Sequence, residues 1–105
     1  MIVSIVRFRS GLGDADVQST FEARSTQYAK VPGLIEKLYL RFRDSGDYGA
    51  VYVWDSNESL ERFHHSELGR TIASAYKVDG APDSELADVR LVVRPASATP
   101  IERPR

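Results

Sequence analysis

Hydrophobic and polar positions along the chain follow two different periods, one typical of strands and one typical of helices. Segments that are rich in β-branched and aromatic residues, with apolar side chains recurring at every second position, predict four strands. These strands are expected over residues 2–9 (IVSIVRFR), 34–42 (LIEKLYLRF), 48–54 (YGAVYVW) and 85–94 (ELADVRLVVR).

Two segments between the strands have the period of an amphipathic helix. The first runs from Asp14 to about Lys30, with Val17, Phe21 and Tyr28 on one face, and ends at Pro32 and its neighbours. The second begins at Asp55, which with Glu58 three residues on is typical of a capping box, and fades after Tyr76. Residues 66–69 (SELG) break or restart it, and residues 80–82 (GAP) predict a loop.

The resulting order, βαββαβ, predicts an α+β fold. It folds most naturally as a ferredoxin-like plait, a four-stranded antiparallel sheet with both helices on one face. Residues 1–94 are expected to form this single domain. The tail, residues 95–105 (PASATPIERPR), is proline-rich without apolar period, which predicts a segment that is disordered or draped over a partner.

The strands carry apolar residues on both faces. Val3 and Ile5 alternate with Val6 and Phe8, whereas a sheet with one face in water should alternate more cleanly. We therefore expect the second face to be buried in a homodimer. A monomer with an irregular pattern is the alternative.

The amino-acid composition excludes several classes of site and partner. The 105 residues are 42% hydrophobic and 28% charged, carry a net charge of −1 and include no cysteine. These values are typical of one soluble domain and exclude a disulfide scaffold, a thiolate metal site and a cysteine nucleophile. Neither nucleic acid nor a membrane is expected as a partner, because there is no basic excess and no apolar run of spanning length. A cytoplasmic location is the expectation.

The two histidines of the chain are adjacent. If the second helix is continuous, Leu60, His64, Leu68 and Ile72 repeat every four residues, so His64 points inward and His65 faces water. An inward imidazole is suited to act as a general base near neutral pH. A partly buried, hydrogen-bonded structural histidine is the alternative. Neighbouring histidines diverge on a helix, so no metal site is predicted.

Polar and aromatic side chains share faces of two strands. Lys37 and Tyr39 lie on one face of the second strand, and Tyr52 and Trp54 on one face of the third. Such a wall would stack a planar phenolic ligand and stabilise a phenolate. The first helix adds Arg24 and Tyr28 in a stripe that is polar for a core face, which favours a wet cavity.

Each of these groups has a simpler interpretation. Tyrosine and tryptophan are common in strands, where they fill the core or a dimer interface, and lysine extends along a sheet edge. The polar stripe of the first helix is equally typical of a helix that is mostly exposed.

Two segments resemble a known family. Residues 31–40 (VPGLIEKLYL) and 49–63 (GAVYVWDSNESLERF) are similar to the ABM-like superfamily of dimeric α+β barrels, named after antibiotic biosynthesis monooxygenases, and most similar to its YdhR-like branch. The resemblance covers about residues 1–94 and implies a dimeric barrel built from two ferredoxin-like domains. Members include cofactor-free oxygenases of anthrones and quinols, haem-degrading enzymes and proteins without a known reaction, so the fold alone does not decide the activity.

The haem-degrading branch uses an asparagine on the first strand and a tryptophan and a histidine on the second helix. In this chain the tryptophan position falls on Phe63 and the histidine position near Ala73, and the first strand has no asparagine. These departures disfavour haem degradation.

The resemblance therefore implies a small cofactor-independent monooxygenase acting on an electron-rich aromatic or quinol-like substrate. His64 is the expected base, with Lys37, Tyr39, Tyr52, Trp54, Arg24 and Tyr28 as the ligand-binding wall, and neither cofactor nor metal is expected. The alternative is a non-catalytic dimeric barrel that binds a small hydrophobic or aromatic ligand.

Overall fold

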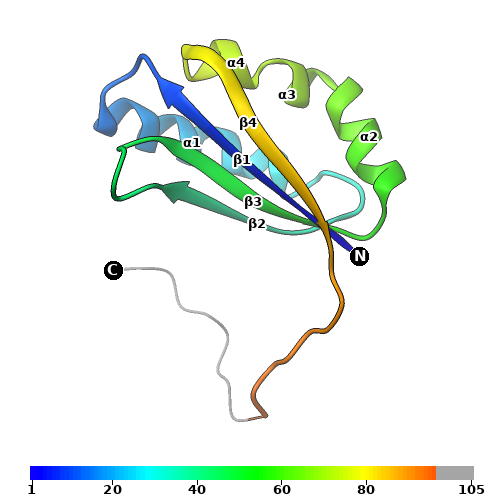
Figure 1. Ribbon diagram of the computed structural model, residues 1–105. Coiled ribbons are helices and arrows are strands. Elements are labelled where there is room, and N and C mark those ends of the chain that lie inside the picture. Colours follow the sequence, from blue (N-terminus) through cyan, green and yellow to red (C-terminus); the bar gives the residue numbers. More distant parts are fainter. Residues whose placement is uncertain (97–105) are drawn as a thin grey trace.

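The computed structural model describes residues 1–96. Four strands and four helices follow one another as β1 (Ile2–Ser10), α1 (Asp14–Tyr28), β2 (Leu34–Arg41), β3 (Tyr48–Trp54), α2 (Asn57–His65), α3 (Glu67–Arg70), α4 (Ile72–Ala75) and β4 (Val78–Asp88). The strands form one antiparallel sheet in the order β2-β3-β1-β4. The predicted ferredoxin-like α+β fold is confirmed (Figure 1).

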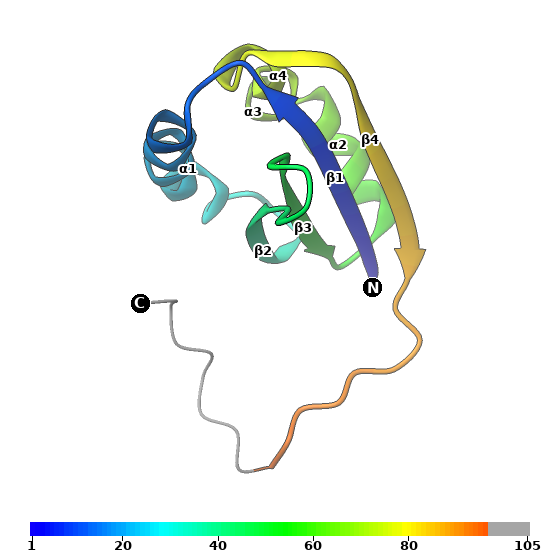
Figure 2. The same ribbon diagram turned by 60° about the vertical axis from the view of Figure 1, so that its left-hand side comes forward.

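The helices gather on one face of the sheet and leave the other face without a helix (Figures 1 and 2). The alternation of side chains along β3 agrees with this arrangement. Every second residue points toward the helices and is buried there: Tyr48, Ala50, Tyr52 and Trp54. Helix α1 contributes Val17, Phe21 and Tyr28 to the same layer, as its apolar face predicts. No helix of residues 1–96 is long and apolar enough to cross a membrane.

The other face of the sheet is apolar at its centre. Ile5 of β1 pairs with Val51 of β3, which pairs with Leu38 of β2, so three apolar side chains lie side by side. Ile5 is 36% exposed and Leu38 is 44% exposed. The strands therefore carry apolar residues at both odd and even positions because both faces of the sheet are apolar. The helices cover only one of these faces.

The fourth strand lies earlier in the chain than predicted. It spans Val78–Asp88, and the predicted loop at residues 80–82 lies within it, at an irregularity in its pairing with β1. An edge strand with a bulge tolerates such glycine and proline residues. The strand ends at Asp88, which pairs with Ile2 at the start of β1. Beyond it, the Val89 N–H still donates to the Met1 carbonyl oxygen at 3.1 Å, and residues 90–94 have no residue of β1 opposite them. Of the predicted tail, residues 97–105 lie outside the described residues.

The second helical region begins and breaks differently from the prediction. The N-cap of α2 is Ser56 rather than Asp55, and its hydroxyl accepts a hydrogen bond from the Ser59 N–H at 3.2 Å. At Ser66 the backbone is extended (φ −75°, ψ 159°), and the Ser66 hydroxyl caps the next short helix, α3, by accepting from the Gly69 N–H. The region is thus three short helices, and the periodicity used for His64 does not continue past Ser66.

Candidate functional site

A cavity of about 330 Å³ lies between the β1–β4 half of the sheet and helices α2–α4. Its walls are mostly apolar, with Val6 from β1, Leu60 and Phe63 from α2, and Ile72 from α4. The polar and charged residues that line it are Ser4, Tyr52, His64, Arg70 and Ser84. The volume is at the lower end of the range of about 300–1,000 Å³ found for small-molecule sites, and an apolar wall with few polar groups is typical of them.

His64 lies at the rim of this cavity, at the C-terminal end of α2. The structure contradicts its predicted burial, because His64 is exposed while its neighbour Phe63 is the buried side chain. The break at Ser66 is the physical reason, since the helix ends before Leu68 and Ile72 can continue the stripe. His64 nevertheless lines the cavity, whereas the exposed His65 does not.

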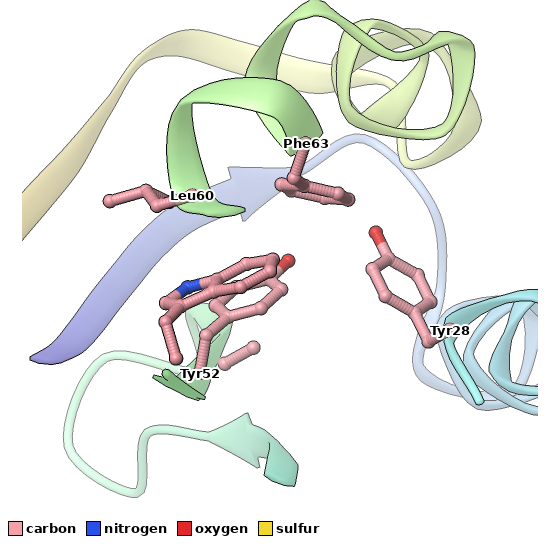
Figure 3. Close-up of a cluster of buried hydrophobic side chains, with 6 residues drawn as sticks. Tyr28, Tyr52, Leu60 and Phe63 are labelled. Atoms are coloured by element: carbon pink, nitrogen blue, oxygen red, sulfur yellow. The ribbon is translucent and has the colours of Figure 1, made fainter. Parts of the chain in front are cut away.

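Tyr52 forms part of the cavity floor and is 4% exposed. Burial, with the neighbouring Tyr28 as a smaller cause, raises the pKa of the Tyr52 hydroxyl well above its usual range. The hydroxyl therefore stays protonated and is a hydrogen-bond donor at neutral pH. Figure 3 shows Tyr52 below Leu60 and Phe63 of α2, with Tyr28 extending from α1 at one side.

Trp54 holds Tyr52 in place from the next position on the same face of β3. The two rings are stacked, with centroids 5.8 Å apart and planes at 9°. Trp54 is fully buried, and its indole N–H donates to the Ser4 hydroxyl at 3.3 Å. Trp54 does not border the cavity, so it supports the ligand wall rather than forming it.

The remaining predicted ligand residues lie on the far side of Tyr52. The Lys37 amine is 4.5 Å from the Tyr52 ring centroid, 4.2 Å from that of Tyr39 and 3.2 Å from that of Tyr28. Lys37, Tyr28 and Tyr39 border a separate cleft of about 270 Å³ between α1 and β2. Of the predicted ligand residues, Tyr52 alone borders the same cavity as His64.

Arg24 is held by contacts with the helices opposite it. Its guanidinium donates to the Leu68 carbonyl oxygen at 2.8 Å and to the Thr71 hydroxyl at 3.3 Å, which ties α1 to the α3–α4 segment. Arg24, which was predicted as part of the ligand-binding wall, therefore has two of its donors engaged in a structural contact.

Burial lowers the pKa of the Lys37 amine to about 6, with the nearby Arg24 charge as the second cause. Desolvation also raises the pKa of Tyr39, so this phenol remains neutral. At neutral pH the Lys37 amine is thus mostly neutral, beside the neutral phenols of Tyr39 and Tyr52. Lys37 would add a positive charge next to a bound phenolate only below about pH 6.

Sequence reasoning missed Ser4 and Tyr76. Ser4 is a buried polar residue in an apolar strand, on the same face as Val6 and Phe8, and this position was a signal that it needs a partner. Tyr76 follows α4 and packs on Phe8 and Phe21, with centroids 5.2 and 5.4 Å away. Its hydroxyl is buried without a hydrogen-bond partner among the described residues, and burial raises its pKa to about 12.

Comparison with solved structures identifies proteins of the same fold. SnoaB, a cofactor-independent oxygenase from Streptomyces nogalater, is 21% identical with a TM-score of 0.70 over 88% of this chain and 95% of its own. A monooxygenase from the gene ActVA-Orf6 of Streptomyces coelicolor, in complex with the ligand Nanaomycin D, is 19% identical with a TM-score of 0.69, over 90% and 92%. A mutant of MhuD with two manganese protoporphyrin IX molecules per active site is 17% identical with a TM-score of 0.70, over 90% and 99%.

These similarities confirm the resemblance at the level of the fold, which is that of antibiotic biosynthesis monooxygenases. Identities this low carry no activity from one protein to another. Neither a family model nor a curated protein sequence matches the chain. The assignment to the YdhR-like branch stays a prediction.

Proposed function

We propose that the protein is a cofactor-independent monooxygenase acting on an electron-rich aromatic or quinol-like substrate. The observation that carries this proposal is the 330 Å³ apolar cavity, with the Tyr52 side chain at its floor and the His64 imidazole at its rim. An imidazole and a phenol that face one apolar cavity can serve a substrate whose deprotonation creates an oxyanion. The shared fold with two oxygenases supports the same activity.

The reaction requires one proton acceptor and no redox group of the protein. His64 removes a proton from a substrate CH₂ group that is activated by a neighbouring phenol. The resulting anion passes one electron to dioxygen, and the two radicals combine through a new C–O bond to give a peroxide. This peroxide takes the proton back from His64 and then loses water, which breaks the O–O bond and leaves a ketone. The sum is R₂CH₂ + O₂ → R₂CO + H₂O.

Tyr52 stabilises the anion in this scheme. Its hydroxyl stays protonated because burial raises its pKa, so it donates a hydrogen bond to the phenolate oxygen of the substrate. Trp54 keeps the Tyr52 ring in position through the stacked contact. Lys37, Tyr39, Arg24 and Tyr28 act behind this wall, as support for Tyr52 rather than as contacts of a substrate in this cavity.

The test is oxygen uptake with a panel of anthrones and hydroquinones. His64→Ala should lower the rate by about 10²-fold or more, the loss expected for a general base. His65→Ala is the matched control, since this neighbouring imidazole is exposed outside the cavity, and it should leave the rate unchanged. Oxygen uptake equal to that of buffer, or equal loss in both variants, would overturn the proposal.

A second candidate function is binding of an aromatic ligand without turnover. It is favoured by one observation, because no hydrogen bond among residues 1–96 orients the His64 ring, as a third group usually orients a catalytic base. Binding alone predicts a ligand-dependent rise in melting temperature without oxygen uptake. Ser84→Phe, which fills the cavity, should abolish this rise, and Ser84→Ala should preserve it.

We further propose that the chain is a homodimer joined through the helix-free face of the sheet. The central apolar side chains of that face are exposed in the single chain, including Ile5 and Leu38. Beyond β4, Leu91 and Val93 are 82% and 77% exposed, which adds apolar side chains that a partner chain could cover. An apolar patch of this kind is typical of an interface between protein chains.

A further inference from the structure

The Lys37 amine is enclosed by aromatic rings that come from three elements. Tyr28 extends from α1, Tyr39 lies two residues along β2, and Tyr52 is paired with Lys37 across the β2–β3 ladder. The ring centroids lie 3.2, 4.2 and 4.5 Å from the amine nitrogen, respectively. The amine is thus fixed in position by side chains of the core instead of extending into solvent, as lysines usually do.

No carboxylate neutralises this amine. The two ion pairs of the described residues join Arg7 to Asp47 and Arg41 to Asp14, and neither includes Lys37. The charged group that does act on Lys37 is Arg24 on α1, which is positive. The titratable groups around it are Tyr28, Tyr39 and Tyr52, and burial keeps the last two neutral.

An amine in such surroundings loses its proton readily. Desolvation, followed by repulsion from Arg24, lowers its pKa to about 6, so most of the amine is neutral at pH 7. A free lysine has a pKa near 10.4, and less than about 0.1% of it is neutral at that pH. Lysines that are desolvated in apolar pockets or placed next to another cation are the ones that act as nucleophiles in proteins.

Lys37 borders an open cleft. This cleft of about 270 Å³ lies between α1 and β2 and is also lined by Ser25, Tyr28, Ala29, Leu34, Ile35, Glu36 and Tyr39, among which Glu36 is the one carboxylate. Behind it lies a void of about 20 Å³ lined by Lys37, Tyr28, Tyr39, Tyr52 and Tyr76, with room for about one water molecule. An apolar molecule with a reactive group at one end fits a cleft of this composition.

We propose that Lys37 is a nucleophilic site that captures small aldehydes with an apolar body as imines in the cleft between α1 and β2. The amine nitrogen forms a bond to the carbonyl carbon, and the carbonyl oxygen leaves as water with both amine protons: R–NH₂ + O=CHR′ → R–N=CHR′ + H₂O. No electron is transferred. This site goes beyond the proposed oxygenase and is independent of it, because the cleft is separate from the cavity of His64.

Tyr39 is placed to assist this step. Its hydroxyl is buried and has no hydrogen-bond partner among the described residues, and Tyr39 is also one of the residues that line the cleft. An unpartnered donor beside the reacting carbon can hydrogen-bond the carbonyl oxygen as that oxygen becomes negative. Tyr39 is therefore a positioning residue in the proposal, while Lys37 forms the bond.

The chain provides its own controls, because it contains three lysines and the other two, Lys30 and Lys77, are exposed. The wild-type protein is incubated at pH 7 with benzaldehyde and sodium cyanoborohydride, which reduces an imine to a stable benzylamine. Peptide mass spectrometry then gives the rate at each lysine. Lys37 should be modified at least about tenfold faster than Lys30 and Lys77, from its larger neutral fraction. The N-terminal amine should also react and serves as a positive control for the reagent.

The pH dependence separates reactivity from mere access. Modification of Lys37 should reach half its maximal rate near pH 6, whereas that of Lys30 and Lys77 should still be rising at pH 9. Equal rates at all three lysines, a Lys37 rate that follows the other two with pH, or no modification of Lys37 while Met1 reacts would each overturn the proposal. Oxygen uptake in the anthrone assay has no bearing on this result.

Discussion

The amine nitrogen of Lys37 lies 3.2 Å from the centroid of the Tyr28 ring, so a cation-forming residue of β2 is packed against the core side of α1. In water the protonated amine would be strongly solvated, and the aromatic rings around it here compensate for only part of that lost solvation. The contact links the stability of the sheet–helix layer to the protonation of a single group.

The first prediction follows from the lowered pKa of Lys37, about 6 in the folded protein against 10.5 ordinarily. Between these values the unfolded chain binds a proton that the folded protein does not, so the free energy of unfolding should rise with pH, by at most about 1.4 kcal/mol per unit. Below pH 6 the amine is charged in both the folded protein and the unfolded chain, so the folded protein bears the full free-energy cost of burying a charged amine. Urea unfolding at pH 6, 7, 8 and 9 measures this slope.

Lys37→Met removes the buried amine and keeps most of its apolar volume. The variant should be more stable than the wild type at pH 6, and the difference should shrink toward pH 9. Lys30→Met, at an exposed position, is the control and should show the wild-type slope. A slope that is the same in the wild type and Lys37→Met would show that the amine is not desolvated in the folded protein.

Two glycines with the same backbone conformation allow a second prediction. Gly33 (φ +81°) and Gly46 (φ +73°) both adopt the left-handed conformation, so alanine is strained at either position, by about 1 kcal/mol. A Cβ at Gly46 meets open space, whereas one at Gly33 would lie 2.0 Å from the Ser59 hydroxyl oxygen. Gly33→Ala should therefore lower the free energy of unfolding by roughly 3 kcal/mol or more, and Gly46→Ala by about 1.

The clash at Gly33 affects the start of the helix that carries His64. Ser59 is buried and donates to the Asp55 carboxylate at 2.6 Å, and this hydrogen bond is the main reason that the pKa of Asp55 is lowered. Displacing Ser59 would break the contact between the β2 entry and the β3–α2 corner. Equal losses for the two alanine variants, measured by urea unfolding, would mean that the corner relaxes freely.

The central strands were predictable because alternation and burial agree in them. Residues 48–54 were predicted as a strand and form β3, with every second side chain, from Tyr48 to Trp54, buried under the helices. The apolar segment at residues 89–94 misled the prediction, because a sheet extends only as far as its partner strand. Ile2 pairs with Asp88, and no residue of β1 remains for Val89 and its successors. The register of a strand pair depends on both strands, so the sequence pattern of one strand does not show where its pairing ends.

The candidate site was predictable only in part. The shared faces of Lys37 with Tyr39 and of Tyr52 with Trp54 follow from the two-residue period of strands, and the structure shows both. The division of these residues between two cavities depends on how helices α1 and α2 pack, which no local pattern specifies. The exposure of His64 has a local cause instead, because Ser66 caps α3 and thereby ends α2 at His65.

The third prediction concerns the buried pair of Trp54 and Ser4. The indole N–H of the fully buried Trp54 donates to the Ser4 hydroxyl, and this is its hydrogen bond within the core. Ser4→Ala should lower the free energy of unfolding by about 1–3 kcal/mol, the cost of an unsatisfied buried donor. Ser84→Ala, at an exposed serine of the adjacent strand, should cost far less. Fluorescence of Trp54, the single tryptophan, reports the unfolding directly, and equal losses in the two variants would contradict the importance of the hydrogen bond.

The fourth prediction tests the proposed dimer. The wild type should sediment with twice the 11.7 kDa mass of the chain at micromolar concentration, because the central apolar side chains of the helix-free face would otherwise remain in water. Leu38→Lys places a charge at the centre of that face and should produce a monomer, since an unpaired charge in an apolar interface is strongly disfavoured.

Ile35→Lys is the matched control for the dimer. Ile35 is 51% exposed and lies on the same strand as Leu38, but it lines the cleft between α1 and β2 instead of the helix-free face. It should therefore leave the sedimenting mass unchanged, and circular dichroism should show that both variants retain the fold. A wild-type monomer at all concentrations, or a Leu38→Lys variant that remains dimeric, would rule out the helix-free face as the interface. Loss of the dimer in Ile35→Lys alone would place the interface at the β2 edge instead.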